Sequence, residues 1–372
     1  MRRFLGVTRN GLQSFQSSKT DHFLQRFSSH SDSDPDAEPA LMLVQTEMRG
    51  RGLAAVSTIQ EGALLFSEMP VVAHGANSGR KGGVTCPHCF RSISKCTASP
   101  CLNLESPSTA AYLAALRSTP FKHLVDSSTR EGVRFPLLAS KLALRCHFSE
   151  TMDNKESPDT SADQNVEDGQ SLRSSVAALV APSHTKVPRE WVESHTIAEH
   201  ALSLLTTGDS TPTNTTEGLD KRVVSAANDD QNVLSLAWFA GALGRLHLNV
   251  MRTSEEAEES GEPRENTNDA SANDGISVLY ALGSFFNHGC RPNVVPHFDG
   301  ACVSWYAARR IEAEEECLIS YRDTDQHNQA NNESEQVQAK SRPESATDEF
   351  LYWNYGFRCK DSCSCGRFQI ST

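Results

Sequence analysis

The sequence predicts an α+β fold, because strand-like runs lie at both ends of the chain and helical runs lie between them. Over residues 41–73, apolar and polar residues alternate around several glycines, which is typical of short strands joined by tight turns. Across residues 108–148, leucines recur at three- and four-residue spacing, as on a helix. Strand-like runs return after residue 275. We therefore expect one α+β domain whose ends come together across an insert.

Further helices are predicted in the middle of the chain and further strands toward its end. Residues 189–205 and 231–251 show helical periodicity. The second of these is expected to place Val233, Leu236, Ala240 and Leu243 on one face. The runs "ISVLYALGSFFNHGC", "NVVPHF", "ACVSWYAARRI" and "CLISY" are strand-like, and the turn "FDGA" divides them.

The net charge of -12 is concentrated in two polar segments. Residues 150–170 carry seven acids and one lysine, a charge of -6, and residues 253–274 carry eight acids and one arginine, a charge of -7, so the rest sums to +1. Such Ser-, Asp- and Asn-rich segments indicate solvated insertions rather than an acidic binding face. No basic stripe marks a nucleic-acid surface, and no apolar run has transmembrane length. We expect neither a nucleic-acid partner nor a membrane.

Cysteine usage indicates a reducing compartment. The chain has eleven cysteines and no secretory signal, and grouped thiols in such a compartment bind metal more often than they form disulfides. Eight of the cysteines form two groups, Cys86, Cys89, Cys96 and Cys101, then Cys290, Cys359, Cys363 and Cys365.

The first thirty residues have the composition of an organelle transit peptide. They hold five Arg or Lys, five Ser and a single acid. A plain disordered tail fits this composition equally well. The location therefore stays open between a mitochondrion or plastid and the nucleus or cytoplasm.

Five short segments occur in a recognisable order. They are "RGRGL" (49–53), "LNVM" (248–251), "NHGCRPN" (287–293), "RRIEAEEECLISY" (309–321) and "NYGFRCKDSCSC" (354–365). Together they resemble the SET-domain protein lysine methyltransferases, and more narrowly the SET-and-MYND subfamily. The resemblance implies a β-fold of short curved sheets with a pseudoknot, split by a helical, cysteine-bearing insert and followed by a post-SET zinc segment.

The implied activity is transfer of a methyl group from S-adenosylmethionine to a lysine side chain of a histone or non-histone protein, by an enzyme expected to be a monomer. A catalytically inactive, zinc-stabilised SET-fold interaction module is the alternative. A metal-storage or redox protein would fit the cysteine count but not the other motifs.

The resemblance also implies a division of the chain. We expect a disordered or targeting segment at 1–40, the N-terminal SET part at 41–75, a MYND-like cysteine segment at 76–104, a helical insert with disordered loops at 105–252, an acidic linker at 253–275, the C-terminal SET part at 276–323, a polar insertion at 324–347 and a post-SET segment at 348–372.

Cofactor contacts are implied for residues in all five segments and for Ser284, which precedes the third. Gly50 and Gly52 let the backbone pass close to the methionine part of the cofactor, although "GRG" alone also fits a strand-end turn. In the family, the residue matching Asn287 bonds the cofactor's amino group, and the one matching His288 holds the adenine mainly through its backbone. The implied cofactor set is Arg49, Gly50, Arg51, Gly52, Asn249, Ser284, Asn287, His288, Tyr321 and Phe357. Pro292 and Asn293 match residues that stabilise the family's pseudoknot, in which this segment is threaded by the C-terminal part of the chain.

Two tyrosines are the implied catalytic residues. The resemblance places the Tyr321 hydroxyl beside the transferring methyl group and Tyr355 in the wall of the lysine channel. Methyl transfer is an in-line displacement by a neutral amine, so the enzyme must position the methyl group and the lysine must lose a proton whose ordinary pKa is about 10.4. Both tyrosines, like Phe357, would be ordinary packing residues if the resemblance failed.

Two zinc sites are implied, one on each cysteine group. Cys290 with Cys359, Cys363 and Cys365 matches the post-SET site, although their C-x3-C-x-C spacing departs from the usual C-x-C-x2-C. At most one zinc fits the MYND-like group, Cys86, Cys89, Cys96 and Cys101, with His88 as a possible substitute ligand. Buried free thiols are the alternative.

Two turn positions depart from the family pattern. Glu314 stands where the family usually has a turn glycine, and Gly289 stands where serine is common. We expect strain at these positions rather than lost chemistry.

Overall fold

The computed structural model forms two compact units built from segments distant in sequence. It describes residues 12–14, 40–46, 49–75, 85–98, 101–130, 135–152, 167–181, 187–207, 232–253 and 275–321, with residues 349, 351, 352, 355 and 357. The first unit comprises Met1–Met69, Arg252–Asp269 and Leu282–Thr372, and the second comprises Pro70–Met251 and Ala270–Ala281. The predicted α+β class is confirmed, and the first unit joins both ends of the chain.

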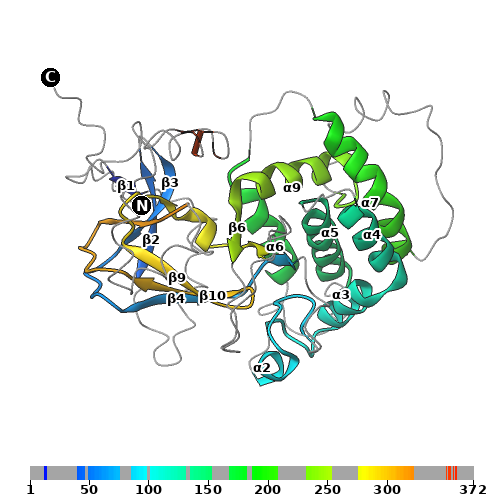
Figure 1. Ribbon diagram of the computed structural model, residues 1–372, viewed down its shortest axis with the longest axis horizontal. Coiled ribbons are helices and arrows are strands. Elements are labelled where there is room, and N and C mark those ends of the chain that lie inside the picture. The colour runs from blue at the N-terminus through cyan, green and yellow to red at the C-terminus, as the bar shows by residue number, and fades with distance from the viewer. Residues whose placement is uncertain are drawn as a thin grey trace, which may run out of the picture. The chain divides into compact units, whose positions relative to one another are not determined.

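The first unit is built on two small sheets (Figure 1). Its strands are β1 (Leu12–Ser14), β2 (Leu41–Thr46), β3 (Gly50–Ala55), β4 (Leu64–Glu68), β8 (Asn287–His288), β9 (Val294–Asp299), β10 (Cys302–Ala307) and β11 (Glu316–Ile319), with a 3-10 turn η4 (Gly283–Phe285). One sheet has the order β1-β2-β3-β11-β8 and the other the order β4-β10-β9. The strands predicted over residues 41–73 and after residue 275 are thus present.

The pairing of β11 places the C-terminal strands against the N-terminal ones. Glu316 and Cys317 pair antiparallel with Ala54 and Leu53 of β3, while Leu318 and Ile319 pair in parallel with β8. Buried Leu53, Ala54 and Cys317 anchor this pairing in the core. The glycines of β3 and the asparagine of β8 consequently lie on the two strands that flank β11.

The second unit is mainly helical. It contains β5 (Val72–Gly75), α2 (Ile93–Ala98), α3 (Pro107–Arg117), α4 (Thr119–Arg130), α5 (Phe135–Met152), α6 (Glu167–Ala178), α7 (Arg189–Thr207), α9 (Leu236–Asn249) and β7 (Ile276–Leu279), and β6 (Val250–Thr253) begins in it. Its sheet has the order β5-β7-β6. The other long helices pack around α5 (Figure 1), whose side chains Leu138, Leu142 and Leu144 are fully buried.

The predicted helices are present, with finer divisions than the sequence indicated. Residues 108–148 form three helices rather than a continuous run. The helix α9 begins after the cap Ser235, whose side chain accepts from the Trp238 N–H. Leu236, Ala240 and Leu243 of the predicted face are buried on it, and Val233 is buried ahead of the helix. No helix in the described part of the chain is long and apolar enough to cross a membrane.

The two ends of the acidic segment at 150–170 are helical. The helix α5 continues into it as far as Met152, and α6 begins at Glu167. An ion pair of 2.6 Å joins Glu150 to Arg173 and links α5 to α6. The pairing offsets part of the negative charge that suggested an insertion.

Candidate functional site

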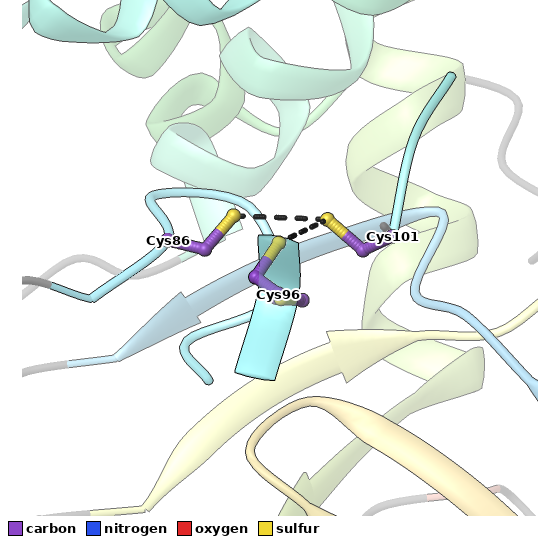
Figure 2. Close-up of side chains that lie close together, drawn as sticks. Cys86, Cys96 and Cys101 are labelled. Carbon is purple, nitrogen blue, oxygen red and sulfur yellow. Dashed lines mark hydrogen bonds between the residues drawn. The ribbon is translucent and has the colours of Figure 1, made fainter. Parts of the chain in front are cut away.

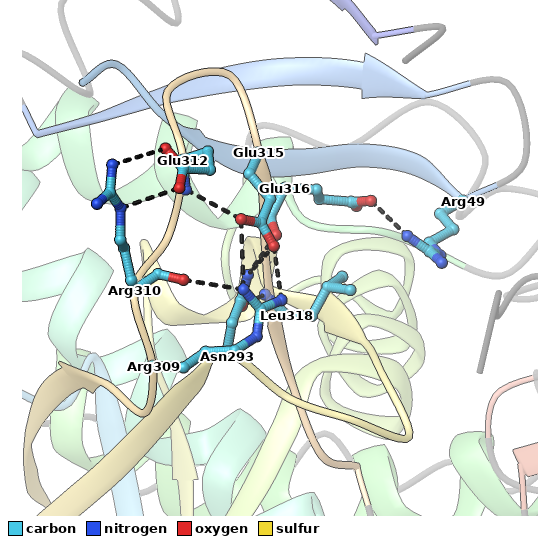
Figure 3. Close-up of polar contacts among 8 residues, drawn as sticks. All are labelled: Arg49, Asn293, Arg309, Arg310, Glu312, Glu315, Glu316 and Leu318. Carbon is cyan, nitrogen blue, oxygen red and sulfur yellow. Dashed lines mark hydrogen bonds and ion pairs between the residues drawn. The ribbon is translucent and has the colours of Figure 1, made fainter. Parts of the chain in front are cut away.

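A polar group on β3, β8 and β11 lies in the first unit. The Asn287 side-chain amide donates to the Arg51 carbonyl at 3.1 Å and to the Glu316 carboxylate at 2.9 Å. The other Glu316 oxygen pairs with the Arg49 guanidinium at 2.5 Å (Figure 3). Arg49, Glu316 and Asn287 therefore form one continuous polar group.

Both glycines of "GRG" have a local reason to be glycine. Gly50 has φ of +75°, a left-handed conformation that costs glycine little. A Cβ atom on Gly52 would lie 2.6 Å from Asn287 Nδ2 and 2.8 Å from Glu316 Oε1. Glycine at 52 is thus what lets the Asn287 amide and the Glu316 carboxylate meet beside β3.

Arg51 lies on the same strand but makes a different contact. Its guanidinium lies over the Phe285 ring, 5.4 Å from the ring centre, in cation–π range. Phe285 ends η4, and Ser284 is the half-buried residue before it. The motif "GRG" and the segment 284–287 are consequently in contact through Arg51 and Asn287.

The His288 ring connects Cys290 to Tyr321. Its Nδ1 accepts a hydrogen bond from the Tyr321 main-chain N–H at 3.1 Å. The proton therefore sits on Nε2, which lies 3.4 Å from the Cys290 sulfur and donates to it. Since His288 is 2% exposed, its orientation is fixed by these two contacts.

Aromatic residues surround the Tyr321 phenol. The Tyr355 ring centre lies 4.6 Å from that of Tyr321, and Phe357 lies 6.3 Å from Tyr321 and 6.2 Å from His288. These rings and Cys290 pack on the buried Leu351. Loss of solvation raises the pKa of the Tyr321 phenol above its usual value, so the phenol stays protonated at neutral pH.

A second polar network fixes the turn before β11. Glu315 pairs with Arg309 at 2.6 Å, and the Asn293 side chain donates to Glu315 and to the Glu316 carbonyl while accepting from the Leu318 N–H (Figure 3). Asn293 is fully buried. The asparagine matched to the family's knot thus ties the segment 287–293 to β11.

The four cysteines of the MYND-like segment lie together in the second unit. Their sulfur atoms are all within 4.8 Å of one another, and Cys101 lies 3.6 Å from both Cys86 and Cys96 (Figure 2). A tetrahedral zinc with Zn–S bonds of about 2.3 Å requires sulfurs about 3.8 Å apart. The four buried thiols therefore fit one zinc ion.

The prediction that His88 could serve as a substitute ligand for this cysteine group is wrong. It is fully buried, but its Nε2 lies 2.9 Å from the Pro70 carbonyl and its Nδ1 lies 3.3 Å from the Tyr112 hydroxyl. Both ring nitrogens are thus engaged away from the sulfurs. The His88 side chain instead holds the cysteine loop against the chain at Pro70.

Some predicted site residues lie elsewhere or outside the described residues. Asn249 belongs to the second unit, where its amide donates to the Val180 and Arg245 carbonyls at 2.8 and 2.7 Å. Cys359, Cys363 and Cys365 lie outside the described residues, so the post-SET zinc site is represented by Cys290 alone among the described residues. The threading of the knot by the C-terminal segment also lies outside them.

Glu316 is the site residue that sequence reasoning missed. It belongs to the run "EAEEE", which resembles a solvated charged turn. The alternation of β11 was an available signal, because Cys317 and Ile319 are apolar and buried while Glu316 and Leu318 point to the other face.

The arrangement defines a class of protein: a split α+β domain in which β11 lies between a Gly-x-Gly strand and an Asn-His strand and is followed closely by Tyr321. The chain belongs to the SET-domain family, whose profile matches residues 50–322. It is 24% identical over 317 residues to a SET and MYND domain-containing protein of Dictyostelium discoideum, covering 80% of this chain and 75% of that protein.

Among solved structures, the chain is similar to the SET domain of LSMT in a crystal structure bound to lysine and AdoHcy. The identity is 11% and the TM-score 0.37, and the match covers 92% of this chain. The chain spans 57% of that protein's length.

Proposed function

We propose that this chain is a S-adenosylmethionine-dependent protein-lysine N-methyltransferase. The observation that carries the proposal is the strand β8, whose two residues face two different groups. The Asn287 side chain is held at Gly52 and Glu316, and the His288 ring is held at Tyr321. On this proposal, Asn287 would contact the cofactor, and the adjacent His288 would hold Tyr321 in the wall of the lysine channel.

The cofactor would be held by Arg49, Gly50, Arg51, Gly52, Ser284, Asn287, His288, Tyr321 and Phe357. Asn287 has an amide oxygen that makes no hydrogen bond within the described part of the chain, so it can accept from an ammonium group. The bound cofactor supplies the methyl group.

The catalytic role is proposed for Tyr321, with Tyr355 as a wall of the lysine channel. The Tyr321 hydroxyl donates to the Phe286 carbonyl at 2.7 Å, so the lone pairs of its oxygen can accept an N–H of the substrate amine. That contact would align the amine. It would not take up the amine's proton, because the raised pKa keeps the phenol itself protonated at neutral pH. The aromatic walls exclude water around the amine.

The zinc sites are proposed to be structural. Cys86, Cys89, Cys96 and Cys101 would hold one ion with four thiolates and no open position, which is the composition of a structural site. Cys290 with Cys359, Cys363 and Cys365 would hold a second. The segment boundaries given above, including the post-SET segment at 348–372, are part of the same proposal.

Calorimetric titration with S-adenosylhomocysteine tests the cofactor assignment. Asn287→Ala should weaken binding by about 1–3 kcal/mol through the loss of a charge-assisted hydrogen bond. Asn103→Ala is the control, because Asn103 is an exposed asparagine of the second unit that only supports a turn at Glu105. Wild-type affinity in Asn287→Ala would refute the assignment.

Mass spectrometry tests the reaction. The purified chain is incubated with a cell lysate and a cofactor carrying a labelled methyl group, and labelled lysines are sought. Tyr321→Phe serves as the inactive reference. Cofactor binding with no labelled lysine in any protein would favour the interaction module over the enzyme.

A further inference from the structure

Asn287 is held by an acidic side chain from the neighbouring strand. Glu316 begins β11, and β8 is the parallel neighbour of that strand. The Glu316 Oε1 atom accepts from the Asn287 amide at 2.9 Å, and 10% of the Glu316 side chain is exposed. A largely buried carboxylate therefore orients one amide.

The contacts fix which way the amide points. A carboxylate has no hydrogen to donate and can only accept hydrogen bonds. The NH₂ group of Asn287, not its oxygen, must therefore face Glu316. The second amide hydrogen is taken by the Arg51 carbonyl at 3.1 Å. A flipped amide would set its oxygen against two other acceptors, so the oxygen is turned away from both.

The surroundings of Glu316 hold its side chain in place. Arg49 pairs with its other oxygen, which offsets the cost of holding a carboxylate with little solvent. Gly52 supplies the space, because a Cβ there would lie 2.8 Å from the carboxylate. The arrangement thus needs Arg49, Gly52 and Glu316 together.

We propose that Glu316 is a positioning residue that acts through Asn287: it turns the Asn287 oxygen toward the ligand and makes the site selective for ligands that carry an α-ammonium group. The inference rests on the proposed function, in which Asn287 meets the cofactor's amino end. A negative charge hydrogen-bonded to the NH₂ side of an amide also strengthens the oxygen as an acceptor.

The test compares two ligands that differ by one group. S-adenosylhomocysteine and its deaminated analogue, which lacks the α-amino group, are titrated calorimetrically against the full-length chain. Wild type should prefer the amine by about tenfold or more, in the range of one charge-assisted hydrogen bond. Asn287→Ala should abolish the preference.

Glu316→Met removes the acceptor but keeps the length of the side chain, and should reduce the preference by about threefold or more, which is half of a tenfold preference on a logarithmic scale. Glu316→Gln keeps an oxygen that can accept from Asn287 and should retain most of the preference. In the Asn287→Ala background, Glu316→Met should change the preference no further. Glu312→Ala is the control, because Glu312 is an exposed acid of the same turn that pairs with Arg310.

The outcomes are distinguishable. Equal losses for both ligands in Glu316→Met, in protein with wild-type circular dichroism, would show a structural role and overturn the inference. A further loss of preference when Glu316→Met is added to Asn287→Ala would show direct contact and would also overturn it. If Glu316→Met does not fold, loss of preference in Glu316→Gln decides against the inference and its retention supports it. Failure of wild type to bind either ligand would instead refute the proposed cofactor.

Discussion

The hydroxyl of Tyr321 donates a 2.7 Å hydrogen bond to the main-chain carbonyl of Phe286. This bond directs the phenol proton away from the place where an amine would meet the oxygen. Tyr321→Phe keeps the ring that packs on Tyr355 and Leu351 and removes that acceptor. On the proposed function, kcat should fall by roughly 10²-fold or more while cofactor affinity changes little.

Steady-state kinetics on an identified substrate checks this prediction. Tyr306→Phe is a matched control, because Tyr306 is a half-buried tyrosine of β10 whose ring contacts His297. A wild-type kcat in Tyr321→Phe would assign the role to another residue.

Zinc should be found on the MYND-like cysteines. Cys96→Ser is expected to lower the zinc content by about one ion per chain, because a serine hydroxyl is a poor replacement for a thiolate ligand. Cys146→Ser changes another buried cysteine, on α5 and outside the cluster, and should leave the zinc content unchanged. Metal analysis of the two purified variants measures the difference, and equal zinc content would contradict the site.

Lys141 should make stability depend on pH in zinc-free protein. Its ammonium is buried and donates to the Ala73 and Pro87 carbonyls at 2.7 and 3.2 Å, and burial lowers its pKa to about 7. The unfolded lysine, with a pKa of about 10.4, binds more protons above pH 7, so this group makes folding more favourable as pH rises toward 10.

The size of this effect is about 2 kcal/mol between pH 7 and pH 9. Lys141→Met has no proton to lose, so its free energy of unfolding should lack that rise. Denaturant unfolding of wild type and Lys141→Met at several pH values gives the difference. A difference independent of pH would show that Lys141 keeps its proton, contrary to the prediction.

Gly289 should not tolerate the serine that is common in the family. A Cβ at this position would lie 2.9 Å from the Leu318 Cβ, closer than side chains pack, so β8 or β11 would have to shift. Gly289→Ser should lower the free energy of unfolding by about 1–3 kcal/mol. Leu318→Ala removes the obstructing atoms beyond Cβ, and the double variant should lose less than the sum of the single losses. Additive losses would contradict the contact.

Glu314→Gly should stabilise the fold. Glu314 has φ of +66°, a left-handed conformation that costs a residue with a Cβ roughly 1 kcal/mol relative to glycine. Its N–H donates to the Ala55 carbonyl at 2.8 Å, which holds the backbone in that conformation. Thermal unfolding should show a higher Tm in Glu314→Gly, and a lower one would contradict this account. Glu312→Gly, in the same turn, serves as the comparison, since Glu312 has no positive φ.

The sequence by itself determined the α+β class, the order of the motifs and most of the strands and helices. Those features depend on local patterns: alternation over residues 41–73, leucine spacing in α5, and glycines that permit tight turns. The grouping of Cys86, Cys89, Cys96 and Cys101 was also readable, because ligands for one ion are close in the chain. The family resemblance added Asn287, Tyr321, Tyr355 and Phe357, and the structure brings the last three together with His288.

Only the tertiary structure decided which of several similar residues does what. Glu312, Glu314, Glu315 and Glu316 are nearly equivalent in the sequence, yet Glu312 pairs with Arg310, Glu314 has a positive φ, Glu315 pairs with Arg309 and Glu316 accepts from Asn287. His88 stood beside two cysteines but turns to Pro70 and Tyr112. These choices follow from the register of β11 between β3 and β8 and from packing against distant segments, and such long-range contacts leave no periodic signal in the chain.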